Sequence, residues 1–436
     1  MTTINVGLLG LGTVGSGVAK IMIEEADLLS QKLGHNLRLA KVCVRNLSSR
    51  RNFSPPTEIL TTEPGEVVGQ PDIPVVVELM GGLEPARTLV LQALSAGQHV
   101  VTANKALLAV HGREIFQKAA ETGREIKFEA AVAGAIPVIR ILKEGLTANR
   151  IQSVFGILNG TTNHILTRMT KDAMTFQAAL AEAQQSGYAE ADPTNDVEGF
   201  DAAHKLVLLT ALSYGVLPQV SDFHVEGVTR LEPEDFTAAA EFGYVIKLLA
   251  VSTLDQADGR LEIRLHPTML PAKSLMAGVN GVMNAVMIRG HASGDIFLSG
   301  AGAGMMPTAS AVMGDIIETS RDLRAGSAPQ VPALGWKNLQ SWSVKPQQEI
   351  RLSYFLRFTV IDKPGVLSAI SGILGRHDIS IAQAIQKSFE PARGGVTLII
   401  LTHKAREMDL QAALAEAEKL DALTAPTRLI RVENQI

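Results

Sequence analysis

The sequence predicts a mixed α/β protein whose front part is a doubly wound parallel sheet. Strand-like and helix-like stretches alternate from residue 4 to about residue 141, the order that a parallel sheet covered by helices on both faces requires. Residues 151–300 change to glycine-separated strands and long helices, which is typical of an α+β part. From residue 350 the predicted elements follow the βαββαβ order of a ferredoxin-like unit.

Composition narrows the class of protein. The 436 residues are 46% hydrophobic, enough for two to four packed domains. A net charge of −4 without a long basic run argues against a nucleic-acid partner or a membrane surface. The single cysteine, Cys43, is expected to be a buried thiol. Because no apolar stretch is long enough to span a membrane and the N-terminus lacks a basic leader, we expect a cytoplasmic protein.

A glycine pattern opens the front part, directly after the apolar residues 4–9. The first glycine allows a tight turn, the second leaves room for phosphate groups, and the third lets the next helix pack closely against the strand. The N-terminus of that helix then presents free N–H groups to an anion. The pattern predicts a Rossmann-type dinucleotide site made by Gly10, Leu11, Gly12, Thr13, Val14 and Gly15.

The remaining front elements are expected at helix 14–32, strand 37–44, strand 75–79, helix 86–96, strand 99–102, helix 112–121 and strand 126–129. The second strand leads into Arg45, where an NAD-binding chain often carries an acidic residue for the ribose. Arg45, Arg50 and Arg51 suit the 2′-phosphate of NADP. A solvated basic loop explains the same cluster equally well.

Two lysines and a carboxylate are candidates for chemistry. Lys105 lies just past strand 99–102, where open α/β sheets bind ligands, although a lysine at a helix start on the surface also explains it. Asp201 and Lys205 are four residues apart in the helix predicted at 197–213, so they share one face. Such pairs usually lie at the surface. Here the apolar residues 206–212 are expected to carry the pair toward the interior or a cleft.

The later segments are less specific. Glu129 is one carboxylate among small residues, and a hydrogen-bonded glutamate is favoured over a cation site. A glycine-rich stretch at 300–304 precedes a helix expected at 307–319, and residues 324–349 have the composition of a linker. Beyond it we expect strand 352–360, helix 365–376, strands 379–387 and 396–402, helix 405–420 and strand 428–432.

Several segments together resemble the bacterial, monofunctional homoserine dehydrogenases that carry a C-terminal ACT domain, over nearly the whole chain. The most family-specific is Tyr188-Ala189-Glu190-Ala191-Asp192-Pro193, followed by Asp201 and Lys205. The turn at Asp362-Lys363-Pro364-Gly365 resembles the start of an ACT module. The other matching segments are residues 10–17, 77–82, 102–105, 129–137, 156–163, 187–205 and 300–315.

The resemblance implies roles for individual residues. Lys205 would be the proton donor when an aldehyde is reduced, with Lys105 in the same site, and Glu190 and Asp201 would bind the amino acid end of the substrate. Glu129 and the backbone carbonyls of Val132, Gly134 and Ile136 would ligate Na⁺ or K⁺. The nucleotide, NADP or NAD, would be contacted by Thr13, Val14, Arg45, Lys105, Gly187 and Gly302.

The implied activity is the reversible, NAD(P)H-dependent reduction of L-aspartate 4-semialdehyde to L-homoserine, in threonine, methionine and isoleucine biosynthesis. L-threonine is the implied effector of the ACT domain, and a homodimer or homotetramer is expected. The expected division is a nucleotide domain at 1–137 completed by about 300–323, a substrate and dimerisation domain at 138–299, the linker 324–349, and the ACT domain at 350–436.

Two other functions are compatible with a nucleotide-binding front. An enzyme like aspartate dehydrogenase gives no reason for Glu190, Asp201 and Lys205 to occur together. A non-catalytic sensor of nucleotides and amino acids gives no reason for a lysine at the cleft, and no DNA-binding motif is visible.

Overall fold

The computed structural model describes residues 2–327, 330–387 and 395–436. The chain divides into two compact units. Unit 1 comprises Met1–Gly160, Asp201–Val220 and Val282–Trp342, and unit 2 comprises Thr161–Phe200, Ser221–Gly281 and Ser343–Ile436. Each unit is therefore assembled from segments that are distant in the sequence.

Unit 1 contains a six-stranded parallel sheet with the order β3-β2-β1-β4-β5-β6. The direction of strand succession reverses between β1 and β4, which is where open α/β sheets bind ligands. All side chains of β4 and β5 are buried, as expected for strands covered on both faces. The bounds are β1 Thr3–Leu9, β2 Asn36–Cys43, β3 Leu60–Thr61, β4 Val75–Glu78, β5 His99–Thr102 and β6 Ile126–Lys127. The predicted doubly wound sheet is confirmed.

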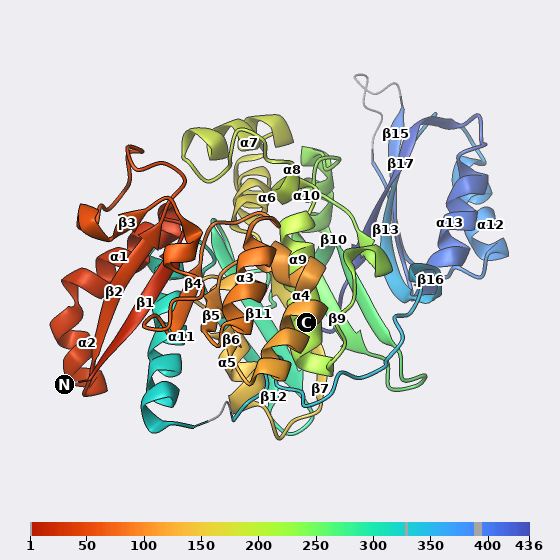
Figure 1. The fold of residues 1–436 in the computed structure, drawn as a ribbon. Helices are drawn as coiled ribbons and strands as arrows, with labels where there is room; N and C mark the ends of the chain where they lie inside the picture. Colours follow the sequence, from red (N-terminus) through yellow and green to blue (C-terminus); the bar gives the residue numbers. More distant parts are fainter. Residues whose placement is uncertain (1, 328–329, 388–394) are drawn as a thin grey trace. The chain divides into compact units, whose positions relative to one another are not determined.

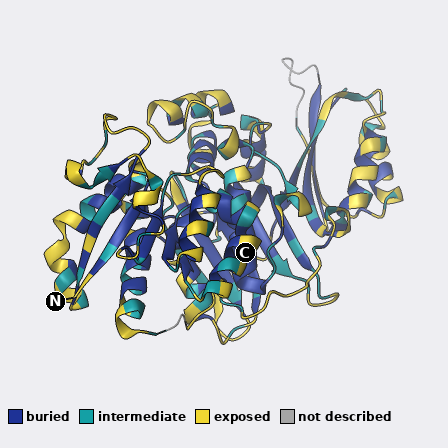
Figure 2. Cartoon of the chain, viewed as in Figure 1, coloured by how far each residue is buried: buried dark blue, intermediate teal, exposed yellow. Residues whose placement is uncertain are grey.

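Two helix pairs cover this sheet. Helix α1 (Thr13–Glu24) packs on α11 (Met305–Ala325), and α3 (Ala86–Ser95) packs on α4 (Lys105–Thr122), one pair on each face (Figure 1). Because a Cβ atom on Gly17 would lie 2.8 Å from the Cβ of Ala309, α1 and α11 approach to backbone contact. Their apolar faces belong to the same core as the strands, drawn dark blue in Figure 2.

Three predicted boundaries in the front part of the chain are wrong. The helix expected at 14–32 is two helices, α1 and α2 (Ala26–Leu33), because Glu25 leaves the helical conformation. Helix α4 begins at Lys105 rather than at residue 112, since the Asn104 side chain caps it by accepting a hydrogen bond from the Leu107 N–H at 3.1 Å. The strand expected at 126–129 ends at residue 127, so Glu129 lies in a short 3₁₀ turn.

The rest of unit 1 holds a three-stranded antiparallel arrangement in the order β12-β11-β7 and a buried helix. Every residue of α9 (Phe200–Tyr214) from position 206 to 214 is buried, as expected for a helix that is apolar on all sides. The other bounds are α5 Val138–Arg140 with a π-helical turn at Ile141–Gly145, β7 Ile151–Ile157, β11 Met283–Gly290 and β12 Gly294–Ala301.

Unit 2 combines helices with a long antiparallel pair, β9 (Tyr244–Leu254) and β10 (Leu261–Pro271). Its other elements before the C-terminal part are α6 Gly160–Asp172, α7 Phe176–Gln185, α8 Thr194–Val197, β8 His224–Val225 and α10 Pro233–Glu241. Short 3₁₀ turns occur in the chain at Thr57–Ile59, Pro64–Glu66, Val220–Asp222 and Gln347–Glu349.

The C-terminal part of unit 2 has the predicted βαββαβ order, with a two-residue strand β16 added. Its sheet order is β17-β13-β15-β14, and α12 and α13 lie side by side on one face (Figure 1). On its other edge β17 pairs in parallel with β10, Thr268 opposite Arg431 and Met269 opposite Val432. The bounds are β13 Arg351–Val360, α12 Val366–Arg376, β14 Ile381–Gln386, β15 Val396–Thr402, β16 Ala405–Arg406, α13 Glu407–Ala417 and β17 Leu423–Val432.

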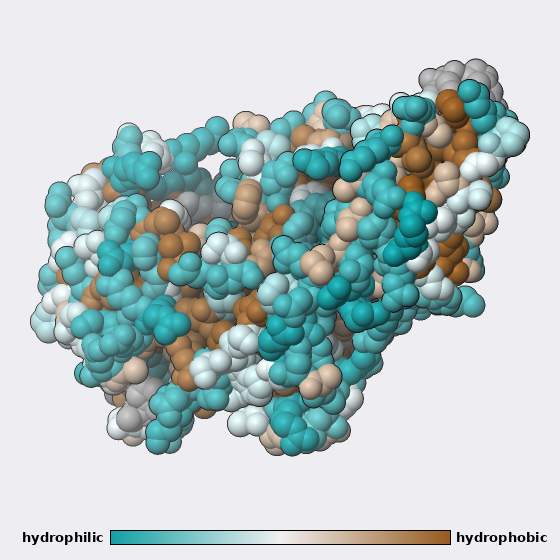
Figure 3. Space-filling model, turned by 90° about the vertical axis from the view of Figure 1, so that its right-hand side faces the viewer, coloured by the Kyte–Doolittle hydropathy of each residue, from teal (hydrophilic) through white to brown (hydrophobic). Residues whose placement is uncertain are grey.

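The surface is mainly hydrophilic on the face drawn in Figure 3, with hydrophobic residues in separate patches. Within the described ranges no helix has the length and apolar character needed to cross a membrane. The predicted linker includes residues 328–329, which lie outside the described residues, and its start is the last turn of α11.

Candidate functional site

The glycine turn after β1 has the shape of a phosphate cradle. Gly10 has φ +99°, and a Cβ atom there would lie 2.7 Å from the Leu79 carbonyl oxygen. A Cβ on Gly15 would lie 2.2 Å from the Gly10 oxygen, whereas a Cβ on Gly12 would meet no atom within 4 Å. Helix α1 begins at Thr13 and Val14, and no side chain caps its N-terminus. Gly10 and Gly15 are closely packed, whereas the space beside Gly12 is open. This arrangement can accommodate a dinucleotide pyrophosphate.

A buried network of hydrogen bonds stabilises the edge of the sheet beside this turn. One oxygen of the fully buried Glu78 accepts hydrogen bonds from the Met80 N–H at 2.8 Å and the Gly81 N–H at 3.2 Å. Its other oxygen accepts from the Thr102 hydroxyl at 2.7 Å. Asn104 donates to the Gly82 carbonyl at 2.7 Å and thereby connects the start of α4 to the segment that follows β4. Sequence analysis missed this network, although an acidic residue ending an apolar strand is a usable signal.

Two lysines meet at one carboxylate. Lys205 Nζ lies 2.6 Å from Asp201 Oδ2, and Lys105 Nζ lies 3.2 Å from Asp201 Oδ1. Lys105 is the first residue of α4 and follows the carboxyl end of β5, while Asp201 and Lys205 occupy successive turns of α9. Since the strands are parallel, the cluster belongs to the same sheet edge as the glycine turn. The expected inward position of the Asp201–Lys205 pair is confirmed.

The charges in this cluster are unevenly buried. The side chains of Lys205 and Asp201 are 10% and 12% exposed, and that of Lys105 is 40% exposed. Burial alone would raise the pKa of Asp201, but the ammonium groups of Lys205 and Lys105 hold it well below its usual range. Asp201 is therefore ionised, and it stabilises a positive charge on both lysines. Only the Lys105 end is broadly open to a ligand.

The loop between β7 and α6 holds the amine of Lys205 in place by hydrogen bonding. The Leu158 carbonyl accepts a hydrogen bond from Lys205 Nζ at 2.6 Å, and Asn159 Nδ2 donates to Asp201 Oδ2 at 2.9 Å. Both residues directly precede Gly160, where a Cβ atom would lie 2.7 Å from the Val282 carbonyl oxygen. Asn159 is a contact that sequence analysis did not assign, and nothing local in its sequence indicates it.

The basic loop after β2 uses only one of its arginines internally. Arg51 donates to the carbonyls of Leu47 and Ser49, both at 3.0 Å, and also to that of Asn46, which closes the loop. Arg45 and Arg50 are exposed, and within the described part of the chain neither forms an ion pair. Two guanidinium groups of the cluster are thus available for an anion.

The Glu129 segment is buried and oxygen-rich. Glu129 accepts from the backbone N–H groups of Ile139 at 2.8 Å and Arg140 at 2.9 Å, so it caps α5. Burial raises its pKa, which these hydrogen bonds and Arg140 partly offset. The Val132 and Gly134 carbonyls accept no hydrogen bond from the described residues, while the Ile136 carbonyl accepts from Val138 N–H at 2.8 Å. These oxygens are a suitable donor type for a hard cation.

Gly302 lies against this segment. A Cβ atom on Gly134 would lie 2.5 Å from the Gly302 carbonyl carbon, and Ala135 N–H donates to the Ala301 carbonyl at 3.1 Å. A Cβ on Gly302 would lie 2.1 Å from the Asn284 side chain. Only glycine therefore fits at position 302, because a larger side chain would collide with Asn284.

Two predicted site residues belong to unit 2. Gly187 has φ +72° and follows α7, where its N–H donates to the Gln184 carbonyl at 3.1 Å. The Glu190 carbonyl accepts from the Gln184 side chain at 3.1 Å, and the residue is exposed. These contacts fold the segment that leads from α7 to α8.

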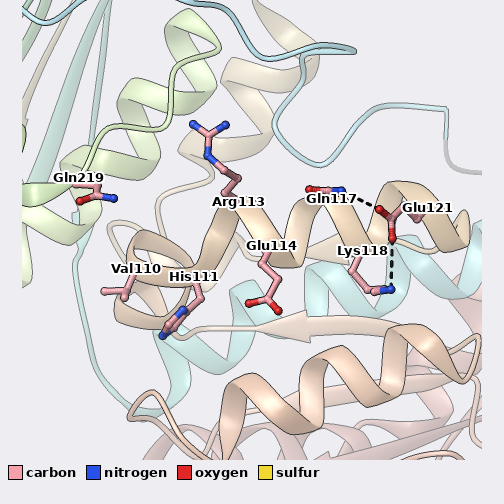
Figure 4. A pocket seen from close by; sticks show the side chains of 8 residues that line it. All are labelled: Val110, His111, Arg113, Glu114, Gln117, Lys118, Glu121 and Gln219. Carbon is pink, nitrogen blue, oxygen red and sulfur yellow. Dashed lines mark hydrogen bonds and ion pairs between the residues drawn. The ribbon is translucent and has the colours of Figure 1, made fainter.

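A shallow hollow of about 490 Å³ on unit 1 contains none of the predicted site residues. It runs along α4 and is lined by Val110, His111, Arg113, Glu114, Gln117, Lys118, Glu121 and Gln219 (Figure 4). Its charged groups are partly paired, since Glu121 contacts Lys118 at 3.3 Å and Gln117 at 2.8 Å. The hollow gives no sign of chemistry.

Family models match three consecutive parts of the chain. The NAD-binding domain of homoserine dehydrogenase matches residues 10–129, the homoserine dehydrogenase model matches residues 137–317, and the ACT model matches residues 354–422. The first match begins at the glycine turn, and the second contains Asp201 and Lys205.

Full-length relatives agree. Homoserine dehydrogenases from Neisseria gonorrhoeae and Pseudomonas aeruginosa are each 42% identical, covering 100% and 99% of this chain and 99% of each relative. The crystal structure of a homoserine dehydrogenase from Thiobacillus denitrificans superposes with a TM-score of 0.93 at 44% identity, covering 100% of this chain and 99% of that one. With its nicotinamide dinucleotide domain, catalytic domain and ACT domain, the chain belongs to the homoserine dehydrogenase family.

Proposed function

We propose that this enzyme reversibly reduces L-aspartate 4-semialdehyde to L-homoserine with NADPH, in the biosynthesis of threonine, methionine and isoleucine. The observation that carries the proposal is the contact of Lys105 and Lys205 with one buried carboxylate, Asp201, at the ligand-binding edge of the parallel sheet. Positioned ammonium groups at such an edge suit reduction of a carbonyl, since negative charge grows on its oxygen.

Lys205 is the proposed proton donor. When a reduced nicotinamide is bound, it would supply the hydride for the carbonyl carbon. Lys205 Nζ stabilises the oxygen as it becomes negative and then transfers a proton to it. The Leu158 carbonyl and Asp201 hold this amine in one position, so little reorganisation is needed during the reaction. Lys105, which is more exposed, contacts the same substrate from the entrance of the site.

The amino acid end of the substrate is proposed to bind Asp201 and Glu190. A carboxylate has about four lone-pair directions, so Asp201 can accept an α-ammonium group as well as its lysine partners. The proposal for Glu190 rests on the family-specific segment in which it occurs and on its exposed side chain. Holding the α-ammonium group would set the distance of the aldehyde carbon from the hydride.

We propose NADP rather than NAD as the preferred cofactor. The exposed Arg45 and Arg50 follow β2, where the adenosine ribose lies in Rossmann domains. An archaeal relative, 26% identical over 78% of this chain and 100% of that one with a TM-score of 0.62, was solved in complex with NADPH. Thr13, Val14, Lys105, Gly187 and Gly302 are the other proposed nucleotide contacts. Changing Arg45 to Ala should raise KM for NADPH about tenfold or more and leave KM for NADH nearly unchanged.

A monovalent cation, Na⁺ or K⁺, is proposed at Glu129 and the carbonyls of Val132, Gly134 and Ile136. The two carbonyls without hydrogen bonds from described residues support this proposal. The ion would stabilise the segment that contacts Gly302 and would take no part in the reaction itself. Activity assayed in Na⁺ or K⁺ against a bulky organic cation at equal ionic strength tests it.

Regulation is proposed through the ACT domain, with L-threonine as the effector. ACT domains suggest small-molecule control, and the chain carries one at residues 354–422. We further propose a homodimer or homotetramer in the cytoplasm, and domains at 1–137 completed by 300–323, at 138–299, and at 350–436 after the linker 324–349. Light scattering measures the number of subunits.

One assay tests the reaction. NADPH absorbance is followed with L-aspartate 4-semialdehyde, with oxaloacetate plus ammonia, and without a substrate. Rapid oxidation only with the semialdehyde supports the proposal. Oxidation with oxaloacetate and ammonia alone would indicate an enzyme of the aspartate dehydrogenase kind, and no oxidation with either would indicate a nucleotide sensor.

A further inference from the structure

The hydrogen-bond network of Glu78 connects two segments at the ligand-binding edge of unit 1. Glu78 ends β4 and Thr102 ends β5, and the two residues lie opposite each other in the parallel register. From this pair the network reaches the loop that follows β4 on one side and the first turn of α4 on the other. None of its residues is among those proposed to contact the substrate or the nucleotide.

One arm of the network shapes the loop that follows β4. A Cβ atom on Gly10 would lie 2.9 Å from the Met80 nitrogen, so this loop packs directly against the phosphate turn. Gly81 and Gly82 have left-handed φ values of +72° and +71°. The N–H groups of Met80 and Gly81 both donate to Glu78 and hold the backbone in this bend. The carboxylate therefore supports one wall of the phosphate turn.

The other arm holds the start of α4. The Thr102 hydroxyl donates to Glu78 at 2.7 Å and accepts a hydrogen bond from the Asn104 N–H at 3.0 Å. The Asn104 side chain donates to the Gly82 carbonyl and caps the helix with its oxygen. Lys105 is the next residue and the first of the helix. The direction from which its side chain enters the site therefore depends on these contacts.

A carboxylate at position 78 determines the direction of the hydrogen bonds around it. Because it only accepts, the Thr102 hydroxyl donates to it and keeps its lone pairs for the Asn104 N–H. A glutamine would either turn its NH₂ group toward the N–H groups of the loop or leave the hydroxyl proton without this acceptor. Glu78 is fully buried, and none of the ion pairs among the described residues includes it. Packing of a strand end alone would not require such a residue, since burial of an unpaired charge is costly.

We propose that Glu78, Thr102 and Asn104 are positioning residues of the reaction, which direct the amine of Lys105 toward Asp201. They act on Lys105 through the first turn of α4 rather than on the substrate. The contact that depends on them is the one of 3.2 Å between Lys105 Nζ and Asp201 Oδ1. The effect on turnover rests on the proposed function, whereas the effect on the amine does not.

The amine is measured first, without turnover. Acetic anhydride acylates an amine only in its uncharged form, and the contact with Asp201 keeps Lys105 charged. We expect the labelling rate of Lys105 in the full chain, measured by mass spectrometry at constant pH, to rise about threefold or more in Thr102→Val. Lys118 on the same helix is the matched control, because it is 36% exposed against 40% for Lys105 and lies 3.3 Å from Glu121. Its labelling rate should not change.

A double-mutant cycle then measures the effect on the reaction. At saturating NADPH, Thr102→Val should lower kcat/KM for the semialdehyde about fivefold, mainly through KM, and Thr102→Ser should restore it because serine keeps the hydroxyl. In the Lys105→Ala background, Thr102→Val should cost less than about twofold, since no amine remains to be positioned. A substitution that only loosens the fold would have the same cost in both backgrounds.

Thr61 offers a matched control for the cycle, because it has the same pattern of hydrogen bonds at the end of another strand. It ends β3, its hydroxyl donates to Glu66 at 3.0 Å, and the same hydroxyl accepts from the Glu63 N–H at 3.1 Å. Strands β2 and β1 separate it from β4. Any cost of Thr61→Val should therefore be equal with and without Lys105.

Asn104→Ser keeps the test independent of the folding of Thr102→Val. Serine is as good a helix cap as asparagine but lacks the amide that donates to Gly82, so Tm should stay near that of the wild type while labelling of Lys105 increases. Unchanged labelling of Lys105 in both variants, or equal costs of Thr102→Val in the two backgrounds, overturns the proposal. A wild type that does not oxidise NADPH with the semialdehyde contradicts the proposed function, and the labelling rates then decide this inference alone.

Discussion

Two of the buried lysines, Lys205 of unit 1 and Lys247 of unit 2, have opposite surroundings. Lys205 of unit 1 contacts a carboxylate, Asp201, at 2.6 Å. Lys247 of unit 2, on β9, is 1% exposed and donates to neutral oxygens: Asn163 Oδ1 at 3.1 Å, Asn280 Oδ1 at 3.3 Å and the Val279 carbonyl. Within the described residues no carboxylate pairs with Lys247. Burial and the repulsion of Lys171 lower its pKa to about 8.

The difference separates the lysine that we propose as proton donor from a structural one. Lys247 ties the start of α6 to residues 279–281, because Asn163 in turn donates to the Gly281 carbonyl at 3.0 Å. Its neutral partners tolerate loss of the proton. Lys205 has a buried anion that preserves its charge, and it lies at the sheet edge where ligands bind. Burial alone is therefore a poor indicator of catalysis. An anionic partner is not sufficient either, since the buried Lys127 and Lys345 also pair with carboxylates. Lys205 differs from them by its place at the ligand-binding edge of the sheet.

The largest expected effect comes from removing the amine of the proposed proton donor. Lys205→Ala should lower kcat by about 10²–10⁴-fold, because the developing oxyanion loses its charge partner and its proton donor. Binding of NADPH, measured by fluorescence titration, should stay nearly unchanged. Unaltered turnover would remove Lys205 from the mechanism.

A smaller loss is expected when the shared anion is neutralised. Asp201→Asn leaves Lys105 and Lys205 side by side without the carboxylate between them, so each ammonium group disfavours the other. We expect kcat/KM to fall about 10²-fold and the alkaline limb of the pH–rate profile to move to lower pH. A profile that keeps the wild-type limb would show that Asp201 does not control the charge of the amine.

Lys105→Ala should have an effect of about tenfold, mainly on KM for the semialdehyde, because the 40% exposed Lys105 is screened by solvent. Steady-state kinetics at two salt concentrations measures this. Lys118→Ala on the same helix is the matched control, since Lys118 pairs with Glu121 on the surface. A loss as large as that of Lys205→Ala would make Lys105 an equal partner in the chemistry.

Lys247→Met should leave kcat nearly unchanged and alter the pH dependence of stability. The native pKa of about 8 is below the ordinary value of 10.5, so between these values the unfolded chain binds more protons and wild-type stability rises with pH. Across this pH interval the free energy of unfolding of the wild type should rise by about 3 kcal/mol, and this lysine should cause no such rise below pH 8. Urea unfolding of both proteins at about pH 8 and about pH 10 measures it. A difference between them that is constant with pH would contradict this.

Local patterns in the sequence predicted the parts of the site that depend on neighbours in the chain. The Gly10–Gly15 spacing fixed the phosphate turn, and the four-residue spacing of Asp201 and Lys205 predicted their contact because both lie on one helix. The apolar residues after Lys205 correctly indicated that this helix is buried.

Contacts between distant segments were not predictable in the same way. No local signal brings Lys105 to Asp201, or Asn159 to the same carboxylate, because these contacts depend on how α4, α9 and the loop after β7 pack. The start of α4 was missed because Ala103 and Asn104 look like loop residues until the amide is seen capping the helix. The sequence did not indicate a role for Lys247, because a single lysine within an apolar strand does not form a periodic pattern.

Strand β17 has partners on both edges, β13 on one and β10 on the other. The strand therefore belongs to the C-terminal module and also to the sheet that contains β10. An exchange of the C-terminal module for that of a relative has to take both pairings into account. A chimera in which β17 is replaced together with the module would lose the native pairing of Thr268 and Met269 of β10 with this strand, and unpaired edges invite aggregation. The practical graft point is therefore inside the loop between α13 and β17, so that the recipient keeps its own last strand.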